Sequence, residues 1–346
     1  MFTSVPERRS TELTAHSVGS LAALKHRIET TGSETVTYGT PPMTDSDQPP
    51  SPDRLTELLE DEAHEEAVAC LDRLDAVDAD GRKRALRATR ALAEQRPRVF
   101  DGLTAPLTTF LTDDDRAVRL TTAKLFVTLA RSEPTVVVPV VESLAARVAD
   151  DAEFYYVRAR CAEALGYVAL DHPGEVSDPE TLADFRVGLS FDEPEVKEKL
   201  AKALAYVALG DPGRLRHQAS SLAEHLDDES TLVRYHLCTA LVVVGCERPE
   251  KLSGTEGELR ERLTDDSPYV QGRAAEALAL LAQSRVTVDP IPDLDGIDVV
   301  DDDTPSFLTD RVRFARRVLE DGDQPVPDRL GTVDAVRAGM DDVVAE

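Results

Sequence analysis

Residues Leu222–Val244 read LAEHLDDESTLVRYHLCTALVVV, and this stretch contains the pattern that decides the fold. An acidic turn is followed by Val233, and apolar residues then recur 4, 7, 8 and 11 positions after this valine. Those residues are Leu237, Ala240, Leu241 and Val244. Positions with this spacing share one face of a helix, which has about 3.6 residues per turn. The stretch therefore predicts an acidic turn followed by a helix with one buried face.

The same pattern recurs at nearly constant spacing along the chain. The valines that begin each copy are 39, 39, 37 and 37 residues apart, and they are Val118, Val157, Val196, Val233 and Val270. The register extends back to Gly81 and forward to Phe307, and in this last copy only Arg311 interrupts the apolar positions. Self-similarity at this period, with one buried helix face per repeat, is typical of an α-solenoid. We therefore predict an all-α solenoid of about six full repeats, each a pair of antiparallel helices.

Prolines mark the other half of each repeat. They precede the valines by 21 or 23 residues, and they are Pro97, Pro134, Pro173, Pro212 and Pro249. Proline suits the first turn of a helix and cannot continue a preceding one. Carboxylates in the turn before each valine can cap the next helix and interact favourably with its dipole. We expect each repeat to contain a first helix opened by the proline, an acidic turn, and a second helix in phase with the valine.

Composition separates the repeats from the C-terminal part of the chain. Residues 53–285 carry the regular pattern and are expected to form the repeat array. Residues 286–304 contain Pro290, Pro292 and an Asp run, which predicts an acidic linker loop in place of a first helix. Residues 305–346 are expected to form degenerate C-terminal capping helices, because terminal repeats are usually atypical.

The first part of the chain differs in kind from the rest. Residues 1–42 have no net charge and no Asp, whereas the remainder is strongly acidic. We expect residues 1–52 to be a disordered N-terminal extension. Met43, where the acidic composition begins, is a possible true start of the protein.

The charge of the whole chain limits its partners. It has 66 acidic and 39 basic residues, a net charge of −27, and only seven lysines. This composition resembles that of proteins from extreme halophiles, in which molar salt screens the repulsion among carboxylates. A salt-rich cytoplasm would also suppress contacts with nucleic-acid phosphates. No apolar run approaches the roughly 18 residues of a membrane span, so we expect a cytoplasmic protein that does not enter a membrane.

The residue types that carry catalysis form no recognisable motif. Four cysteines, Cys70, Cys161, Cys238 and Cys246, lack C-x-x-C spacing and are expected to be small buried side chains. The sequence has no G-x-S-x-G, no glycine-rich phosphate loop and no HExxH motif. We therefore expect no metal, no cofactor and no enzymatic activity. The sequence does not indicate whether the protein binds a small molecule.

The repeat resembles the HEAT repeat. The best copies are Leu222–Arg234 and Val157–Gly166, and the likeness covers residues 55–320. It implies a right-handed α–α superhelix with the second helices on the concave side, used as a binding scaffold. It also implies a ladder in which the residue after each valine pairs with an acidic turn. The residues that match this position are Arg119, Arg158, Lys197 and Arg234, and Gln271 departs from it.

Two enzyme-linked relatives of the HEAT-like proteins supply the alternative function. Deoxyhypusine hydroxylase is similar, and it binds a di-iron centre through His-Glu pairs near the starts of second helices. This chain has one such step, His64-Glu65, outside the regular repeats, and Arg158 and Lys197 begin the corresponding steps within them. Phycobilin-lyase-like HEAT proteins resemble the chain through the repeat alone. The alternative is thus a HEAT-like enzyme or enzyme subunit of either type.

The predicted second helices carry an excess of positive charge. Six segments sum to a net +9, so the rest of the chain carries −36; they are 82–95, 118–130, 157–169, 195–209, 233–245 and 268–282. The candidate partner-binding residues are Arg84, Arg87, Lys124, Arg160, Lys199, Lys202, His236 and Arg273.

These cations have two interpretations. In the first, they pair with the acidic turns and hold neighbouring repeats in register. In the second, they line a concave groove, which predicts a non-enzymatic scaffold or adaptor that binds an acidic protein partner. Nucleic acid is the weaker candidate because the groove offers few stacking aromatics beyond Tyr167 and Tyr206.

Overall fold

The computed structural model describes residues 50–284, 294, 296–297, 304–322 and 324–343. Within these ranges the secondary structure is entirely helical. Almost all of the predicted N-terminal extension, Met43 included, lies outside the described residues. The same holds for most of the predicted linker at 286–304.

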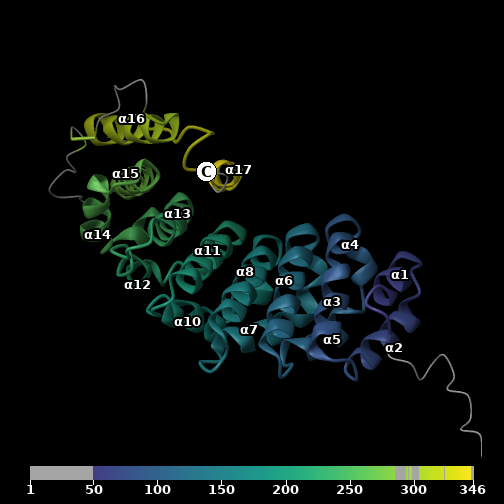
Figure 1. Cartoon of the computed structure of the whole chain (residues 1–346). Coiled ribbons are helices and arrows are strands. Elements are labelled where there is room, and N and C mark those ends of the chain that lie inside the picture. Colours follow the sequence, from purple (N-terminus) through teal and green to yellow (C-terminus); the bar gives the residue numbers. More distant parts are fainter. Residues whose placement is uncertain (1–49, 285–293, 295, 298–303, 323, 344–346) are drawn as a thin grey trace, which may run out of the picture. The chain divides into compact units, whose positions relative to one another are not determined.

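The second helices of the repeats are the long elements of the fold. Each contacts the next in chain order, and Figure 1 shows them side by side. They are α3 (Ala79–Ala88), which α4 (Arg90–Gln95) continues, α6 (Arg116–Ser132), α8 (Tyr155–Asp171), α11 (Pro194–Gly210), α13 (Thr231–Glu247), α15 (Pro268–Gln283) and α16 (Ser306–Asp321). The predicted all-α solenoid is confirmed, because every valine-phased segment forms one helix of this series.

Shorter first helices pack against the second ones and form the other layer. They are α2 (His64–Leu74), α5 (Thr104–Leu107), α7 (Val141–Ala149), α10 (Pro179–Gly188), α12 (Ala219–Ala223) and α14 (Glu256–Glu261). Helix α1 (Arg54–Glu60) packs on α2 at the start of the described chain. From α7 onward each first helix contacts the second helix of its own repeat, so the repeat is a helical pair as predicted.

The prolines open a separate turn and not the first helix itself. They begin η2 (Pro97–Phe100), η4 (Pro134–Val136), α9 (Pro173–Val176), η6 (Pro212–Arg214) and η7 (Pro249–Leu252). The first helix then starts anew, as at α10, where Asp178 Oδ1 accepts the backbone N–H groups of Glu180 and Thr181. In two repeats a glycine of positive φ, Gly102 or Gly254, separates the turn from the helix. The expected single, proline-opened first helix is therefore wrong in this detail.

The core runs continuously between the two layers. Each of the five phase valines, such as Val233, is at most 1% exposed, and the residues at the predicted core offsets are likewise buried. Small residues let the second helices approach closely. A Cβ at Gly166 of α8 would lie 3.0 Å from Ala203 Cα of α11. Full burial of a Val or Leu side chain contributes about 1.5–3 kcal/mol, so this repeated stripe stabilises every repeat.

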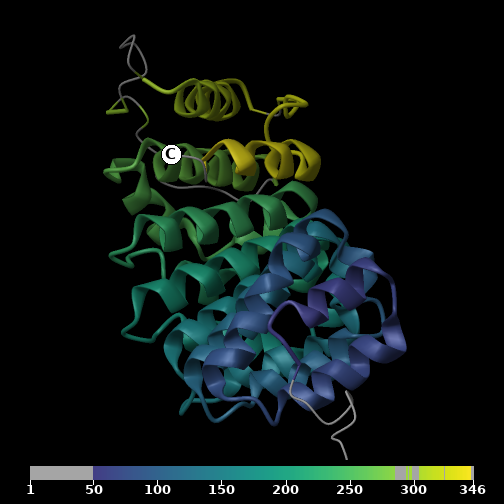
Figure 2. The same cartoon turned by 45° about the vertical axis from the view of Figure 1, so that its right-hand side comes forward.

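The C-terminal helix α17 (Val333–Val343) does not extend the stack beyond α16. It packs instead against α13 and α11, two second helices that lie far earlier in the chain, and Figure 2 shows it beside α13. In the part of the chain that the structure describes, no helix is both long and apolar enough to cross a membrane.

Candidate functional site

One face of the second helices carries every predicted partner-binding residue. It is formed by the residues three and six positions after each phase residue, and we call it the second-helix face. Its members are Arg84 and Arg87, Thr121 and Lys124, Arg160 and Glu163, Lys199 and Lys202, His236 and Thr239, and Arg273 and Glu276. The structure divides this face into three parts of different character.

The first part, on α3 and α6, is open. Arg84, Arg87 and Lys124 are all exposed. Arg84 Nε donates to the backbone oxygen of Asp80, 3.3 Å away in its own helix. Among the described residues no carboxylate forms an ion pair with any of the three cations. They are therefore free to meet an external anion.

The middle part, on α8 and α11, is a charge network around Glu163. Arg160 Nη1 lies 2.6 Å from Glu163 Oε2, and Lys199 Nζ lies 3.0 Å from Glu163 Oε1. Arg160 also donates to Glu195 of α11. Burial by itself would raise the pKa of Glu163, but Lys199, Arg160 and Lys202 outweigh it and lower that pKa. The carboxylate stays ionised and links two repeats.

Lys202 is enclosed in this network. Its side chain donates to Tyr167 Oη at 3.2 Å and lies 3.8 Å from Glu163 Oε1. Its ammonium nitrogen also lies 4.9 and 5.3 Å from the ring centroids of Tyr167 and Tyr206, within cation–π range. Tyr167 and Tyr206, the aromatic residues that the sequence placed in the groove, thus both contact this lysine. Lys202 is 7% exposed and cannot meet a partner, whereas Arg160 and Lys199 retain about a quarter of their side-chain surface.

The third part, on α13 and α15, is closed. His236 is 3% exposed and Arg273 is 0% exposed, so neither predicted binding residue offers surface to a partner. Burial, and then the charges of Lys202 and Lys199, lower the pKa of His236 to about 3. The imidazole is therefore neutral near pH 7. The prediction that these two residues line an open groove fails because both side chains are buried, that of Arg273 against Phe307 of α16.

A buried ionic cluster lies on α15 and α16, on the part of the second-helix face where the sequence predicted a groove. Glu276 Oε2 accepts hydrogen bonds from Arg273 Nη1 at 2.8 Å and Arg311 Nε at 3.0 Å. Glu276 Oε1 accepts the backbone N–H of Gly331 at 2.7 Å. The ring of Phe307 lies against both guanidinium groups. Its centroid is 3.5 Å from Cζ of Arg311 and 5.1 Å from Cζ of Arg273. Arg311, which interrupts the apolar pattern of the last repeat, is thus paired with the buried Glu276 of the preceding repeat.

Three of the four predicted ladder residues reach the acidic turn of the following repeat. Arg119 Nη2 lies 2.9 Å from Glu153 Oε1 and Lys197 Nζ lies 2.6 Å from Asp228 Oδ2. Arg234 holds both oxygens of Asp265, at 2.7 and 2.9 Å. Arg119 and Arg234 also donate to backbone oxygens of their own turns, so each arginine ties two successive turns together.

The remaining ladder positions depart from this geometry. Arg158 donates to the backbone oxygen of Val148 at 3.0 Å, and its guanidinium lies 4.2 Å from the ring centroid of Phe191. Gln271 is too short to bridge, and it donates to the backbone oxygen of its own turn at Asp265. Arg82, one residue after Gly81 and hence at the ladder position of the first copy, pairs with Asp113 at 2.7 Å. The repeat register could have identified Arg82.

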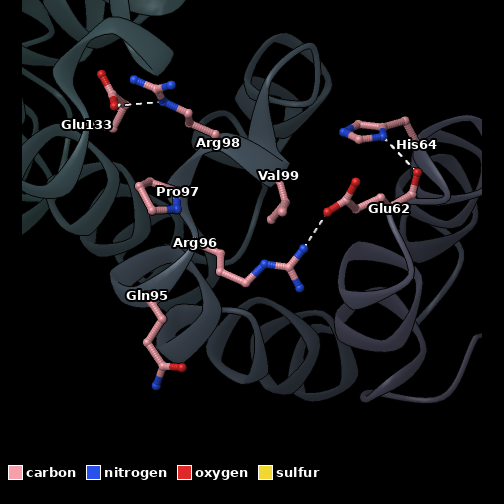
Figure 3. Close-up of a pocket in the computed structure, with 8 residues that line it drawn as sticks. All are labelled: Glu62, His64, Gln95, Arg96, Pro97, Arg98, Val99 and Glu133. Carbon is pink, nitrogen blue, oxygen red and sulfur yellow. Dashed lines mark hydrogen bonds and ion pairs between the residues drawn. The ribbon is translucent and has the colours of Figure 1, made fainter.

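A pocket of about 440 Å³ lies at α4, η2 and the loop after α1 (Figure 3). Its two arginines are already paired, Arg96 with Glu62 at 2.5 Å and Arg98 with Glu133 at 3.0 Å. His64, the histidine of the single His-Glu step, faces the backbone oxygen of Glu62 at 2.9 Å. Across the described ranges no three His, Cys, Asp or Glu side chains are grouped as metal ligands.

Comparisons with known proteins identify the fold. No family model matches the chain, and no curated protein matches its sequence. Among solved structures, one engineered protein has a TM-score of 0.58 at 21% identity, covering 76% of this chain and 73% of its own. A second engineered protein has a TM-score of 0.53 at 22% identity over 63% of this chain and 99% of its own. A designed armadillo repeat protein has a TM-score of 0.52 at 20% identity over 61% of this chain and 98% of its own. The chain therefore has the fold of an armadillo-like helical-repeat solenoid.

Proposed function

We propose that this protein is a non-enzymatic scaffold with HEAT-type repeats that binds an acidic segment of a partner protein on the open part of the second-helix face. One observation carries the proposal: Arg84, Arg87 and Lys124 are exposed without a carboxylate partner among the described residues. In a chain with 66 acidic and 39 basic residues, unpaired cations gathered on one face need an explanation. An anionic ligand supplies the missing counter-charges.

The geometry of packed helices suggests what the ligand looks like. Arg87 and Lys124 occupy the same position on successive second helices, and packed helix axes lie about 8–10 Å apart. A peptide in the polyproline II conformation has three residues per turn and advances about 3.1 Å per residue, so every third side chain lies on the same side, about 9 Å from the next. Acidic side chains at every third position would therefore meet the cations of successive repeats.

Each such contact is weak when it is exposed. A solvent-exposed ion pair contributes about 0.2–1 kcal/mol and is screened by salt. Useful affinity then requires several pairs at once, which a repeat array supplies by presenting equivalent positions in succession. We expect the affinity to fall as the salt concentration rises.

The test uses two fluorescent peptides of equal length, one with Glu at every third position and one with Gln in its place. Binding is measured by anisotropy with the full chain and with the triple variant Arg84→Glu, Arg87→Glu, Lys124→Glu, at several KCl concentrations at which circular dichroism shows both chains to be folded. We expect the wild-type chain to prefer the Glu peptide and the variant to lose at least about tenfold in affinity, or about 1.4 kcal/mol. Its melting temperature should change little, because exposed substitutions typically cost within about 0.5 kcal/mol each.

A matched control separates a local site from a general effect of charge. The variant Arg54→Glu, Arg98→Glu, Arg317→Glu makes the same change in net charge at exposed arginines outside the second-helix face. It should bind the Glu peptide as the wild-type chain does. Equal loss in both variants would contradict the proposal, as would a triple variant that is destabilised but binds normally per folded molecule.

A further inference from the structure

The C-terminal segment lies along the second-helix face and covers its closed part. Gln283, at the end of α15, donates to the backbone oxygen of Gln324, and Gly331 donates to Glu276 in the middle of α15. Helix α17 then packs on α13 and α11, and Arg337 reaches Asp171 at the end of α8, with 2.8 Å between Nη2 and Oδ1. The segment therefore passes over four successive second helices.

Equivalent positions differ in exposure between the open and the closed part of the face. On α6 the residues six and nine positions after the phase valine are Lys124, which is exposed, and Val127, which is half-buried. On α13 the corresponding residues are Thr239 and Val242, and both are 0% exposed. The repeats have the same register, so the difference comes from what packs on them. Helix α17 contacts α13, whereas no such contact of α17 with α6 is found among the described helices, and we attribute the burial of Thr239 and Val242 in part to α17.

We propose that this part of the second-helix face is a docking site for an amphipathic helix, and that α17 is its removable intramolecular occupant. A helical segment of a partner protein that carries the same apolar stripe would displace α17 and gain access to the whole face. The proposal goes beyond the acidic-ligand site, because it concerns different helices and an apolar contact. It makes the C-terminal segment an autoinhibitory element.

Several features make α17 removable. It has 11 residues, below the length at which an isolated helix is stable in water, so it depends on its docking contacts. In residues 329–339 the buried apolar side chains are Leu330 and Val336, and the ion pair of Arg337 with Asp171 is about half exposed on both sides. No helix spans the described residues between α16 and α17, so a tether joins them. Release of α17 would leave the repeats intact.

The partner's chemistry follows from what α17 presents. An apolar residue must take the place of Val336, and a basic residue after it must reach Asp171. Asp334, in the first turn of α17, is exposed. The displacing helix is therefore apolar on one face, with a basic residue directly following its buried anchor.

The probe is a fluorescent peptide of residues 329–346, added in trans to the full chain. In the wild-type chain α17 occupies the site, so we expect weak binding. In the full-length Val336→Asp variant α17 should undock because a carboxylate cannot be buried there without a partner. This variant should bind the peptide at least about tenfold more tightly than the wild-type chain, and hydrogen exchange of the α17 amides should accelerate. The control is Val187→Asp on α10, where Val187 is 62% exposed. It should behave as the wild-type chain does.

Two further arms make the result decisive. A peptide carrying Val336→Asp must fail to bind, because capture by the cations of α3 and α6 would not depend on this valine. If the Val336→Asp chain loses helix throughout, Arg337→Glu replaces it, since that change breaks only an exposed pair, and adding Asp171→Arg should restore closure. Equal peptide binding by the wild-type chain and the undocked variant would overturn the proposal. That outcome would leave the acidic-ligand proposal untouched, because its probe and its variants are different.

Discussion

Replacing Glu276 by Ala should release the C-terminal part of the repeat array. Both carboxylate oxygens of this residue are used, one by two guanidinium groups and the other by the backbone N–H of Gly331. Arg273 and Glu276 are 0% exposed, and the Arg311 side chain is 7% exposed. The substitution leaves two enclosed positive charges without their shared counter-ion.

The magnitude follows from the burial of the cluster. Removing one partner of a buried ion pair typically costs about 3–5 kcal/mol, because an uncompensated charge stays in the interior. Burial lowers the pKa of Arg311 to about 10, with repulsion from Arg273 acting in the same direction against the attraction of Glu276. Whole domains are stable by about 5–15 kcal/mol, so this single change removes a large part of the total.

The assay is denaturant unfolding followed by circular dichroism at constant molar salt, combined with hydrogen exchange. We expect the loss of protection to concentrate in α15, α16 and α17, since repeat arrays unfold locally. Glu276→Gln keeps an acceptor for the backbone N–H of Gly331. Its free energy of unfolding should lie between those of the wild-type chain and the Ala variant. The control is Glu57→Ala, because the pair of Glu57 with Arg54 is about half exposed and should cost under about 1 kcal/mol. A Glu276→Ala cost no larger than that of this control would refute the reasoning.

Four further outcomes are expected. A chain of net charge −27 should be helical in molar KCl and lose helix on dilution, and an unchanged melting temperature at low salt would exclude adaptation to salt. Arg234→Ala removes both hydrogen bonds of Arg234 to Asp265, which is 2% exposed and keeps the more distant Arg262 at 3.6 Å, and should cost about 3 kcal/mol in urea unfolding. Arg54→Ala at an exposed pair should cost under about 1 kcal/mol. Burial and two lysines lower the pKa of His236 to about 3 in the folded chain. Below about pH 6.5 the imidazole of His236 therefore binds a proton in the unfolded chain but not in the folded chain. Stability is thus lost as the pH falls, by about 2 kcal/mol between pH 7 and 5, and His236→Gln should remove this component; identical pH dependence in both proteins would contradict it. Deletion of residues 1–42 should leave the thermal midpoint unchanged, and a marked decrease would mean that they pack on the repeats.

The repeat register was readable from the sequence because it reflects local physics. A helix needs its buried side chains at fixed offsets, and the phase valines mark those offsets without reference to the rest of the chain. The register also singled out Arg311 as the exception in the last copy, although its partner was not apparent. The short turns at the prolines were less predictable, since proline suits a single turn as well as a longer helix.

The candidate site was only half predictable. Offsets from the valine place Lys124 and Arg273 on the same face, and nothing in the two local sequences shows that one is exposed and the other enclosed. The difference arises from contacts between distant segments, such as the hydrogen bond between Glu276 and Gly331, 55 residues apart. A periodic pattern contains no information on where a non-repeating segment returns.

The sequence by itself therefore determined the all-α class, the second helices and the stripe that forms their core, because these depend on spacing along one helix. Only the tertiary structure decided which second-helix cations face solvent, which are paired across repeats, and which are sealed beneath the C-terminal segment. The physical reason is that burial and ion pairing depend on the whole surroundings of a side chain. In this protein those surroundings include α17, whose own pattern does not specify the helices on which it packs.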